Sequence, residues 1–130
     1  MIDLLKSVDA GVREDLTYGR DNADHGFDDW QLPENVGSVG DCEDFMLLAA
    51  HRLLEADADP QTMYFVLCHT AGRKGFNHAF LAVETMDGLH TCADTFDSKP
   101  RPIYSTYRRD ELRQWARVSE PMRWRLWADD

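Results

Sequence analysis

The chain has 130 residues and a net charge of −10 at pH 7, from 24 acidic and 14 basic side chains. This length and a hydrophobic content of 43% predict a single domain over residues 1–130 with a core of its own. The negative charge argues against nucleic acid as a partner, because phosphate contacts dominate such binding. No apolar run approaches the roughly 18 residues that a membrane helix needs, so no membrane insertion is expected.

Residues 2–16 have apolar side chains at helical spacing, which predicts an amphipathic helix. The chain does not open with a basic start followed by an apolar core, so no signal peptide is expected. Residues 18–40 are rich in Gly, Asp and Asn and have little periodicity, which predicts a long irregular segment. Trp30 and Pro33 are the expected anchors of this segment.

The most informative stretch is Gly40-Asp41-Cys42-Glu43-Asp44, which runs directly into the apolar segment 45–54. We predict that a buried helix begins here, with Asp41 as its N-cap and Cys42 in its first turn. The unpaired N–H groups and positive dipole end of a helix N-terminus favour anions, so a thiol there is expected to ionise more readily than a free one. Cys42 is therefore a candidate nucleophile.

Three carboxylates surround this cysteine. Asp41, Glu43 and Asp44 exceed what helix capping requires, and their negative potential opposes a thiolate. A positive group is expected to offset them. A calcium ion is one candidate, because hard cations bind carboxylate oxygens, although no EF-hand pattern is present and no cofactor is required by the chemistry. The arginines of residues 101–125 are the other candidate.

Two later segments bring a histidine and a carboxylate together. Residues 77–84 and 89–94 are rich in β-formers and are separated by a Met-Asp-Gly sequence at 86–88, which predicts a hairpin. The first segment contains His78 and the second contains Asp94. An imidazole beside a carboxylate is the arrangement that activates a nucleophile.

The register of the hairpin decides whether these side chains meet. With a three-residue loop, Asp94 lies opposite Phe80, and His78 is its diagonal neighbour on the same face. With Asp87-Gly88 as a two-residue turn, the parity changes and Asp94 points to the opposite face from His78. A site made of both residues therefore predicts an odd loop. His90 shares face parity with Asp94 and is the alternative contact.

The remaining segments predict supporting structure. Residues 62–69 predict a buried strand, residues 110–116 a short helix, and residues 122–126 a half-exposed strand. Cys68 and Cys92 lie in strand-like segments and are expected to be small buried residues. The three cysteines are widely spaced and form no Cys-x-x-Cys pair, so neither a zinc site nor a disulfide framework is expected.

Taken together, these motifs resemble the bacterial transglutaminase-like cysteine proteinases, within the papain-like and transglutaminase-like group. After the opening helix, the resemblance is carried in order by Asp28-Asp29-Trp30-Gln31-Leu32-Pro33-Glu34, Gly40-Asp41-Cys42-Glu43-Asp44-Phe45, Asn77-His78-Ala79 and Ala93-Asp94. These pieces cover most of the chain. The sequence departs from the family at Ala93-Asp94-Thr95, where Leu-Asp-Asn is frequent. Its compactness and lack of an export signal are similar to phage or prophage members.

The resemblance implies an α+β fold in which the nucleophile helix packs on an antiparallel sheet. It also implies a catalytic triad of Cys42, His78 and Asp94, which would cleave peptide or isopeptide bonds through a thioester. Gln31 and the Trp30 region are secondary candidates for the oxyanion donor, beside the backbone N–H of Cys42 at the helix start. Some members of the family bind calcium through the acids that flank the cysteine.

The expected partner of such an enzyme is a protein or peptide substrate. Two other functions stay open from the sequence. One is a non-catalytic binding or virion assembly module that retains the fold and belongs to a larger assembly. The other is an amidase or acyltransferase with a small-molecule substrate. The expected location is the cytoplasm or the virion.

Overall fold

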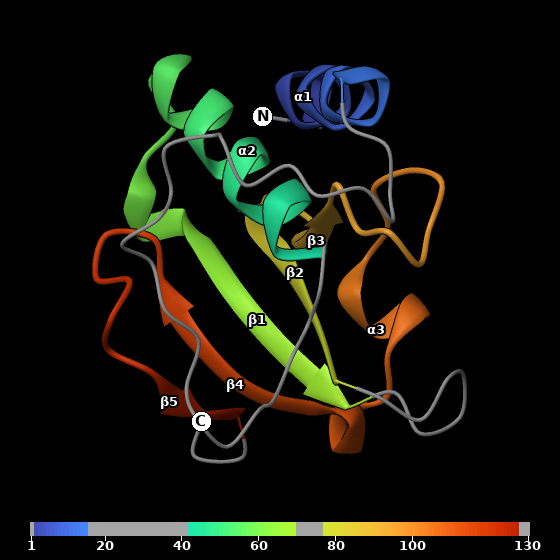
Figure 1. Cartoon of the computed structure of the whole chain (residues 1–130), viewed down its shortest axis with the longest axis vertical. Helices are drawn as coiled ribbons and strands as arrows, with labels where there is room; N and C mark the ends of the chain where they lie inside the picture. The colour runs from blue at the N-terminus through green and yellow to red at the C-terminus, as the bar shows by residue number, and fades with distance from the viewer. Residues whose placement is uncertain (1, 16–41, 70–76, 128–130) are drawn as a thin grey trace.

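The computed structural model describes residues 2–15, 42–69 and 77–127 (Figure 1). The α-helices are α1 (Ile2–Asp15), α2 (Cys42–Glu55) and α3 (Ile103–Thr106). The strands are β1 (Met63–His69), β2 (Asn77–Thr85), β3 (Gly88–Cys92), β4 (Leu112–Arg117) and β5 (Arg125–Leu126). Short 3₁₀ turns at Pro60–Thr62 and Arg109–Glu111 precede β1 and β4. The fold is α+β, as the sequence predicts.

The strands form one antiparallel sheet in the order β3-β2-β1-β4-β5. Helix α2 packs on β2, and α1 lies beside α2 and reaches β3 (Figure 1). Since side chains alternate along a strand, the sheet has two cores. The core under the helices contains Phe65 and Leu67 of β1 with Leu81 of β2. The core on the opposite face contains Val66, Phe80, Ile103, Tyr107, Leu112, Trp115 and Trp127.

Helix α2 has a defined end, and this end fixes the path of the chain into the sheet. Asp57 adopts a left-handed conformation with φ of 67°. The N–H of Ala58 donates to the carbonyl of Leu53, and the N–H of Asp57 donates to the carbonyl of Leu54. This is the Schellman arrangement, which satisfies two carbonyls that the helix leaves without partners. The chain then turns back into β1, which is the central strand of the sheet.

The β2–β3 hairpin has a different loop from the odd one that the sequence predicts. Thr85 pairs with Gly88, so the loop is Met86-Asp87, and the pairing continues to Leu81 opposite Cys92. In this register a continued β3 would place Asp94 on the opposite face from His78. The strand ends at Cys92 instead, and Ala93 takes a left-handed conformation with φ of 54°. This single residue breaks the alternation.

The predicted helix at residues 110–116 is also wrong. Residues 109–111 form one 3₁₀ turn, and residues 112–117 form β4, which pairs with β1. The spacing of Leu112, Trp115 and Ala116 fits a helix, but short apolar segments do not separate helix from strand. Pairing with the open edge of β1 decides the outcome. The predicted final strand at residues 122–126 is observed only as Arg125–Leu126.

We expect truncation of the core between helix and sheet to destabilise the protein strongly. Leu81 is fully buried, so Leu81→Ala is expected to lower the free energy of unfolding by about 2–5 kcal/mol through lost contacts and a residual cavity. Met86→Ala, at the exposed tip of the same hairpin, is the matched control and is expected to stay within about 0.5 kcal/mol. Urea denaturation measures both, and equal effects would contradict the packing described here.

Candidate active site

Three elements bring the predicted site residues to one end of the sheet. Cys42 is the first residue of α2, His78 is the second residue of β2, and Asp94 follows the end of β3. All three side chains are buried, with exposed fractions of 1%, 0% and 1%. The segments that carry them are separated by long stretches of sequence. Their proximity is therefore a property of the fold.

His78 and Asp94 form a buried ion-pair geometry. Nε2 of His78 lies 2.7 Å from Oδ1 of Asp94. The alternative partner, His90, instead contacts Thr85 and the carbonyl of Gly88. The turn at Ala93 explains how Asp94 reaches His78 despite the two-residue loop. The chain leaves β3 after Cys92, so Asp94 is not held on the opposite face of the sheet from His78.

The carboxylate of Asp94 receives two further hydrogen bonds. The N–H of Phe96 donates to Oδ1 at 3.0 Å, and the hydroxyl of Tyr107 donates to Oδ2 at 2.5 Å. Burial alone raises the pKa of Asp94, but the hydrogen bonds and charge of His78, with those from Tyr107 and Phe96, outweigh it and lower the pKa below its ordinary value. Asp94 is thus held as a buried anion.

Helix α1 holds the backbone of this loop in place. Asp9 is 3% exposed and its Oδ1 accepts the N–H of Ala93, while Arg13 pairs with the same carboxylate. Arg13 also donates to the carbonyls of Asp94 and Asp97, at 3.0 and 2.6 Å. We call Asp9 and Arg13 the α1 clamp. The clamp is not among the features predicted from the sequence. Its one signal in the sequence is a carboxylate within the apolar stripe of the first helix, with an arginine four residues later.

The imidazole of His78 is oriented by its neighbours. The ring of Phe96 stacks on it with centroids 3.8 Å apart. Because an ionised carboxylate only accepts hydrogen bonds, Nε2 carries the proton that points to Asp94, and in the neutral ring Nδ1 keeps a lone pair. Nδ1 is buried and has no hydrogen-bond partner in the described part of the chain. A buried base without a partner is an unusual feature that calls for an explanation.

The thiol of Cys42 lies beside the backbone of β2. Its Sγ accepts a hydrogen bond from the N–H of Ala79, the residue next to His78, at 3.4 Å. Pairing between β2 and β3 ends at Leu81 and Cys92, so β3 does not cover the edge of β2 at this position. The end of β3 at Cys92 therefore has two consequences. It lets Asp94 reach His78, and it leaves the edge of β2 open to the thiol of Cys42.

The predicted ease of ionisation of this thiol is not observed. Burial raises the pKa of Cys42 to about 12, the Ala79 hydrogen bond lowers it by less, and the carboxylates of Glu43 and Asp94 raise it further. Desolvation and two nearby negative charges outweigh the favourable helix start. Cys42 is thus a protonated thiol at neutral pH in this state. Cys68 and Cys92 are buried as well.

Several predicted site residues lie outside the described part of the chain. These are Trp30 and Gln31, proposed near the oxyanion, and Asp41, the proposed N-cap and cation ligand. Glu43 and Asp44 are in the first turn of α2. Within residues 2–15, 42–69 and 77–127, no group of three or more His, Cys, Asp or Glu side chains is arranged to hold a metal ion. The set of three acids, which includes Asp41, stays a prediction.

Comparison with protein families identifies the chain. Residues 1–120 match the family model described as bacterial transglutaminase-like cysteine proteinase, BTLCP. The chain belongs to this family. The curated proteins and the solved structures gave no match.

The family name implies the activity of a cysteine peptidase, and a peptidase acts on proteins. It also agrees with the helix on an antiparallel sheet that the structure shows. In the part of the chain that the structure describes, no helix has the length and apolar character needed to cross a membrane.

We expect the buried Asp94 anion to make stability depend on pH. A carboxylate whose pKa is lower in the folded state adds stability above its unfolded pKa of about 3.9, and this stability is lost as the pH falls through the folded value. At pH 7, Asp94→Asn is expected to destabilise the protein by roughly 1–3 kcal/mol. The difference between wild type and variant should shrink on acidification.

Urea denaturation between pH 7 and pH 3 measures this difference. The matched control is Asp87→Asn, which removes a carboxylate at the exposed hairpin tip. A gap between wild type and Asp94→Asn that stays constant or widens toward pH 3 would show that Asp94 is not a stabilising anion.

Proposed function

We propose that the protein is a cysteine peptidase in which Cys42 is the nucleophile, His78 is the general base and acid, and Asp94 orients the imidazole. The observation that carries the proposal is the buried His78–Asp94 pair at 2.7 Å, next to a helix-start cysteine that bonds to Ala79. The free lone pair of His78 Nδ1 gives this arrangement a proton acceptor. The family match supports the same reaction class.

In the proposed reaction, Sγ of Cys42 attacks the substrate carbonyl carbon while its proton passes to Nδ1 of His78. The tetrahedral intermediate then collapses, the C–N bond breaks, and His78 returns the proton to the leaving amine. The product is a thioester on Cys42. A water molecule attacks the thioester while His78 takes its proton. The C–S bond then breaks, His78 returns the proton to Sγ, and the acid and the free thiol are released. Asp94 stabilises the imidazolium that forms in each half of the cycle.

The raised pKa of Cys42 supports one of two forms of this mechanism. A preformed thiolate–imidazolium pair needs a thiol that ionises easily, whereas burial holds this thiol in the protonated form. Proton transfer to His78 during attack avoids a free buried thiolate. Since Nδ1 makes no hydrogen bond in the described structure, the thiol and the ring must come closer in the substrate complex, as catalytic hydrogen bonds often do.

The oxyanion requires at least one N–H donor. The backbone N–H of Cys42 is suited to this role, because it lies at the start of α2, where the positive end of the helix dipole favours a developing negative charge. Gln31 or the Trp30 region is the proposed source of a second donor.

Calcium binding by Asp41, Glu43 and Asp44 is likewise part of the proposal, since these acids would otherwise oppose the negative charge that develops on sulfur. Calcium titration of the purified protein tests it.

The first test is hydrolysis of unfolded protein substrates by matched variants. Cys42→Ala is expected to lower kcat/KM by at least about 10³-fold, and His78→Ala by about 10²–10⁴-fold. Asp94→Asn is expected to reduce kcat and to change its pH profile, because the imidazole loses the partner that fixes its tautomer. Cys68→Ala, on the strand next to His78, is the control and should retain activity.

A second readout is covalent labelling by a peptidyl electrophile, mapped by mass spectrometry. We expect label on Cys42 that depends on His78, while a small alkylating agent reacts slowly below pH 9 because the thiol is protonated. Fast labelling that is unchanged in His78→Ala would refute the general-base mechanism. Full activity of Cys42→Ala would refute the cysteine peptidase proposal.

The α1 clamp is expected to act on catalysis through the position of Asp94. Arg13→Ala removes the bonds to the carbonyls of Asp94 and Asp97, and a displacement of about 1 Å is expected to lower kcat by roughly 10–100-fold with KM little changed. Arg52→Ala, which removes the exposed ion pair with Asp15, is the control. Rates are compared per folded molecule, measured by circular dichroism. A kcat equal to wild type would show that the clamp contributes only to stability.

A further inference from the structure

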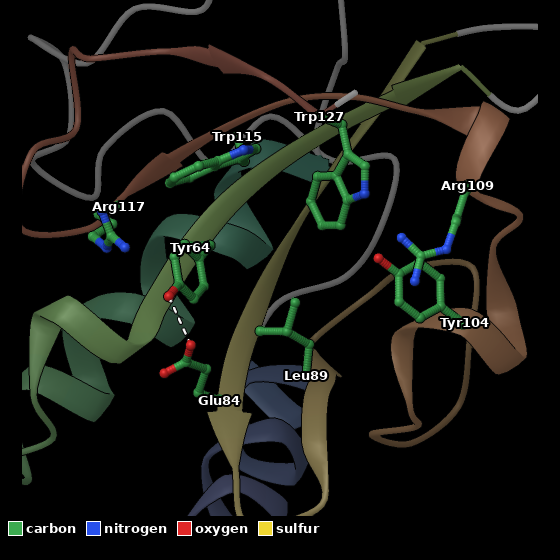
Figure 2. Close-up of a pocket in the computed structure, with 8 residues that line it drawn as sticks. All are labelled: Tyr64, Glu84, Leu89, Tyr104, Arg109, Trp115, Arg117 and Trp127. Atoms are coloured by element: carbon green, nitrogen blue, oxygen red, sulfur yellow. Dashed lines mark hydrogen bonds between the residues drawn. The ribbon is translucent and has the colours of Figure 1, made fainter. Parts of the chain in front are cut away.

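A second feature of the molecule lies on the sheet face opposite α1 and α2. A cavity of about 280 Å³ is lined by residues of β1 to β4 and of the segments around α3 and β5. The lining residues are Tyr64, Glu84, Leu89, Tyr104, Arg109, Trp115, Arg117 and Trp127 (Figure 2). We call this cavity the aromatic pocket. None of these residues takes part in the site proposed for Cys42, His78 and Asp94.

The aromatic pocket is separated from the candidate active site by a packed layer. Tyr64 and Glu84 lie at the opposite ends of β1 and β2 from Cys68 and His78. At about 3.3 Å per residue, the six residues from His78 to Glu84 span roughly 20 Å. The stacked rings of Phe80 and Tyr107 lie on the same face, between the aromatic pocket and His78. The ring centre of Phe80 is 6.1 Å from that of His78. The pocket is therefore a separate feature.

The walls of the aromatic pocket are rings and guanidinium groups. Figure 2 shows Arg117 and Arg109 at opposite ends of the space, with Trp115 and Trp127 between them. The guanidinium of Arg109 lies 4.1 Å from the ring centre of Tyr104, and that of Arg117 lies 5.3 Å from Trp115. These stacked positions hold the guanidinium groups in place.

The positive charge in the aromatic pocket is only partly balanced within the described part of the chain. Arg101, Arg108 and Arg123 pair with carboxylates, whereas neither Arg109 nor Arg117 forms an ion pair with a described residue. The chain as a whole carries −10, so two unpaired cations beside one cavity run against the overall charge. Such a local excess favours an anionic ligand.

A buried donor gives independent support. The indole Nε1 of Trp115 is buried and lacks a hydrogen-bond partner among the described residues. Trp115 as a whole is only 8% exposed. Figure 2 shows its nitrogen edge turned toward Trp127 across the pocket. An indole N–H is a donor only, and a buried donor without an acceptor costs stability. An acceptor atom on a ligand would satisfy it.

Glu84 narrows the class of anion. Its carboxylate accepts the hydroxyl of Tyr64 at 2.9 Å and forms part of the wall. One negative wall group against two guanidinium groups suits a ligand with a single negative charge, and it disfavours a dianion such as a phosphate monoester. The volume is near the lower end of ligand pockets, which run from about 300 to 1,000 Å³, so the ligand is about the size of one amino acid.

We infer that the aromatic pocket is a binding site for a carboxylate carried on an aromatic or large apolar group. The N–H of Trp115 donates to one carboxylate oxygen, Arg109 and Arg117 supply the positive charge, and Trp127, Tyr64 and Leu89 contact the apolar part. A small aromatic acid and the C-terminal residue of a peptide share this chemistry. Binding at this site does not depend on the proposed peptidase activity.

The test is calorimetric titration of the Cys42→Ala protein, which prevents turnover, with 3-phenylpropionate and with its uncharged amide. We expect the acid to bind and the amide to bind at least about tenfold more weakly, because hydrogen bonds to a charged acceptor are lost. The peptide Gly-Gly-Phe with a free or an amidated C-terminus forms a second arm. Tighter binding of the free peptide than of phenylpropionate identifies a peptide C-terminus as the source, and the reverse identifies a small acid.

Variants locate the site. Trp115→Phe keeps a ring and removes only the donor, and Arg117→Gln removes one charge; each is expected to weaken binding of the acid about tenfold or more. Arg113→Gln, on the same strand but outside the pocket, makes the same charge change and should leave the affinity unaltered. Indole N–H resonances of the folded variants, recorded by NMR, should show the Trp115 signal shifting on titration of wild type. No binding of either acid at 10 mM, or equal affinity in Trp115→Phe, Arg117→Gln and wild type, would overturn the inference.

Discussion

The buried carboxylate of Asp94 is the constraint on which the rest of the site depends. An anion removed from water is stable only when donors surround it, and here His78, Tyr107 and the Phe96 N–H provide them from three parts of the chain. The loop that carries Asp94 is in turn held by α1 through Asp9 and Arg13. One buried charge therefore links the first helix, the second strand and the loop before β4.

Under the proposed mechanism, this arrangement makes a protonated, deeply buried thiol compatible with acyl transfer. Burial raises the pKa of Cys42, and the negative charges of Glu43 and Asp94 raise it further. In the proposed reaction, the charge of Asp94 would also stabilise the imidazolium that forms when His78 takes the thiol proton. The same carboxylate thus works against the thiolate alone and in favour of the imidazolium during attack. Under the proposed mechanism, a thiol that ionises only when its proton has an acceptor would be protected from alkylation and oxidation between turnovers.

The sequence predicts the parts of this site whose signals are local. The helix that begins at Cys42 follows from an apolar run after a cluster of capping residues, and the strand of His78 follows from its β-formers. The position of Asp94 was predicted for the wrong reason, since the odd loop is absent and a left-handed Ala93 replaces it. Nothing in an alanine signals such a conformation, because glycine or asparagine is the usual residue there. The strand β4 was missed because only its pairing with β1 distinguishes it from a helix.

The two faces of the sheet divide the work of the molecule, and the strand alternation produces that division. The face under α1 and α2 is covered mainly by aliphatic side chains, with Phe45 and Phe65 among them, and it packs the start of α2 against β2. The other face is richer in rings, which run from His78 and Phe80 through Tyr107 to the aromatic pocket. Rings pack with directional edges and carry donors such as the Trp115 N–H, so this face orients the imidazole of His78 at one end and carries the site proposed for a ligand at the other. Phe80 and Tyr107 stack on each other between the two ends, and Tyr107 also bonds to Asp94, so the packed side chains of this face connect the candidate site with the cluster that borders the aromatic pocket.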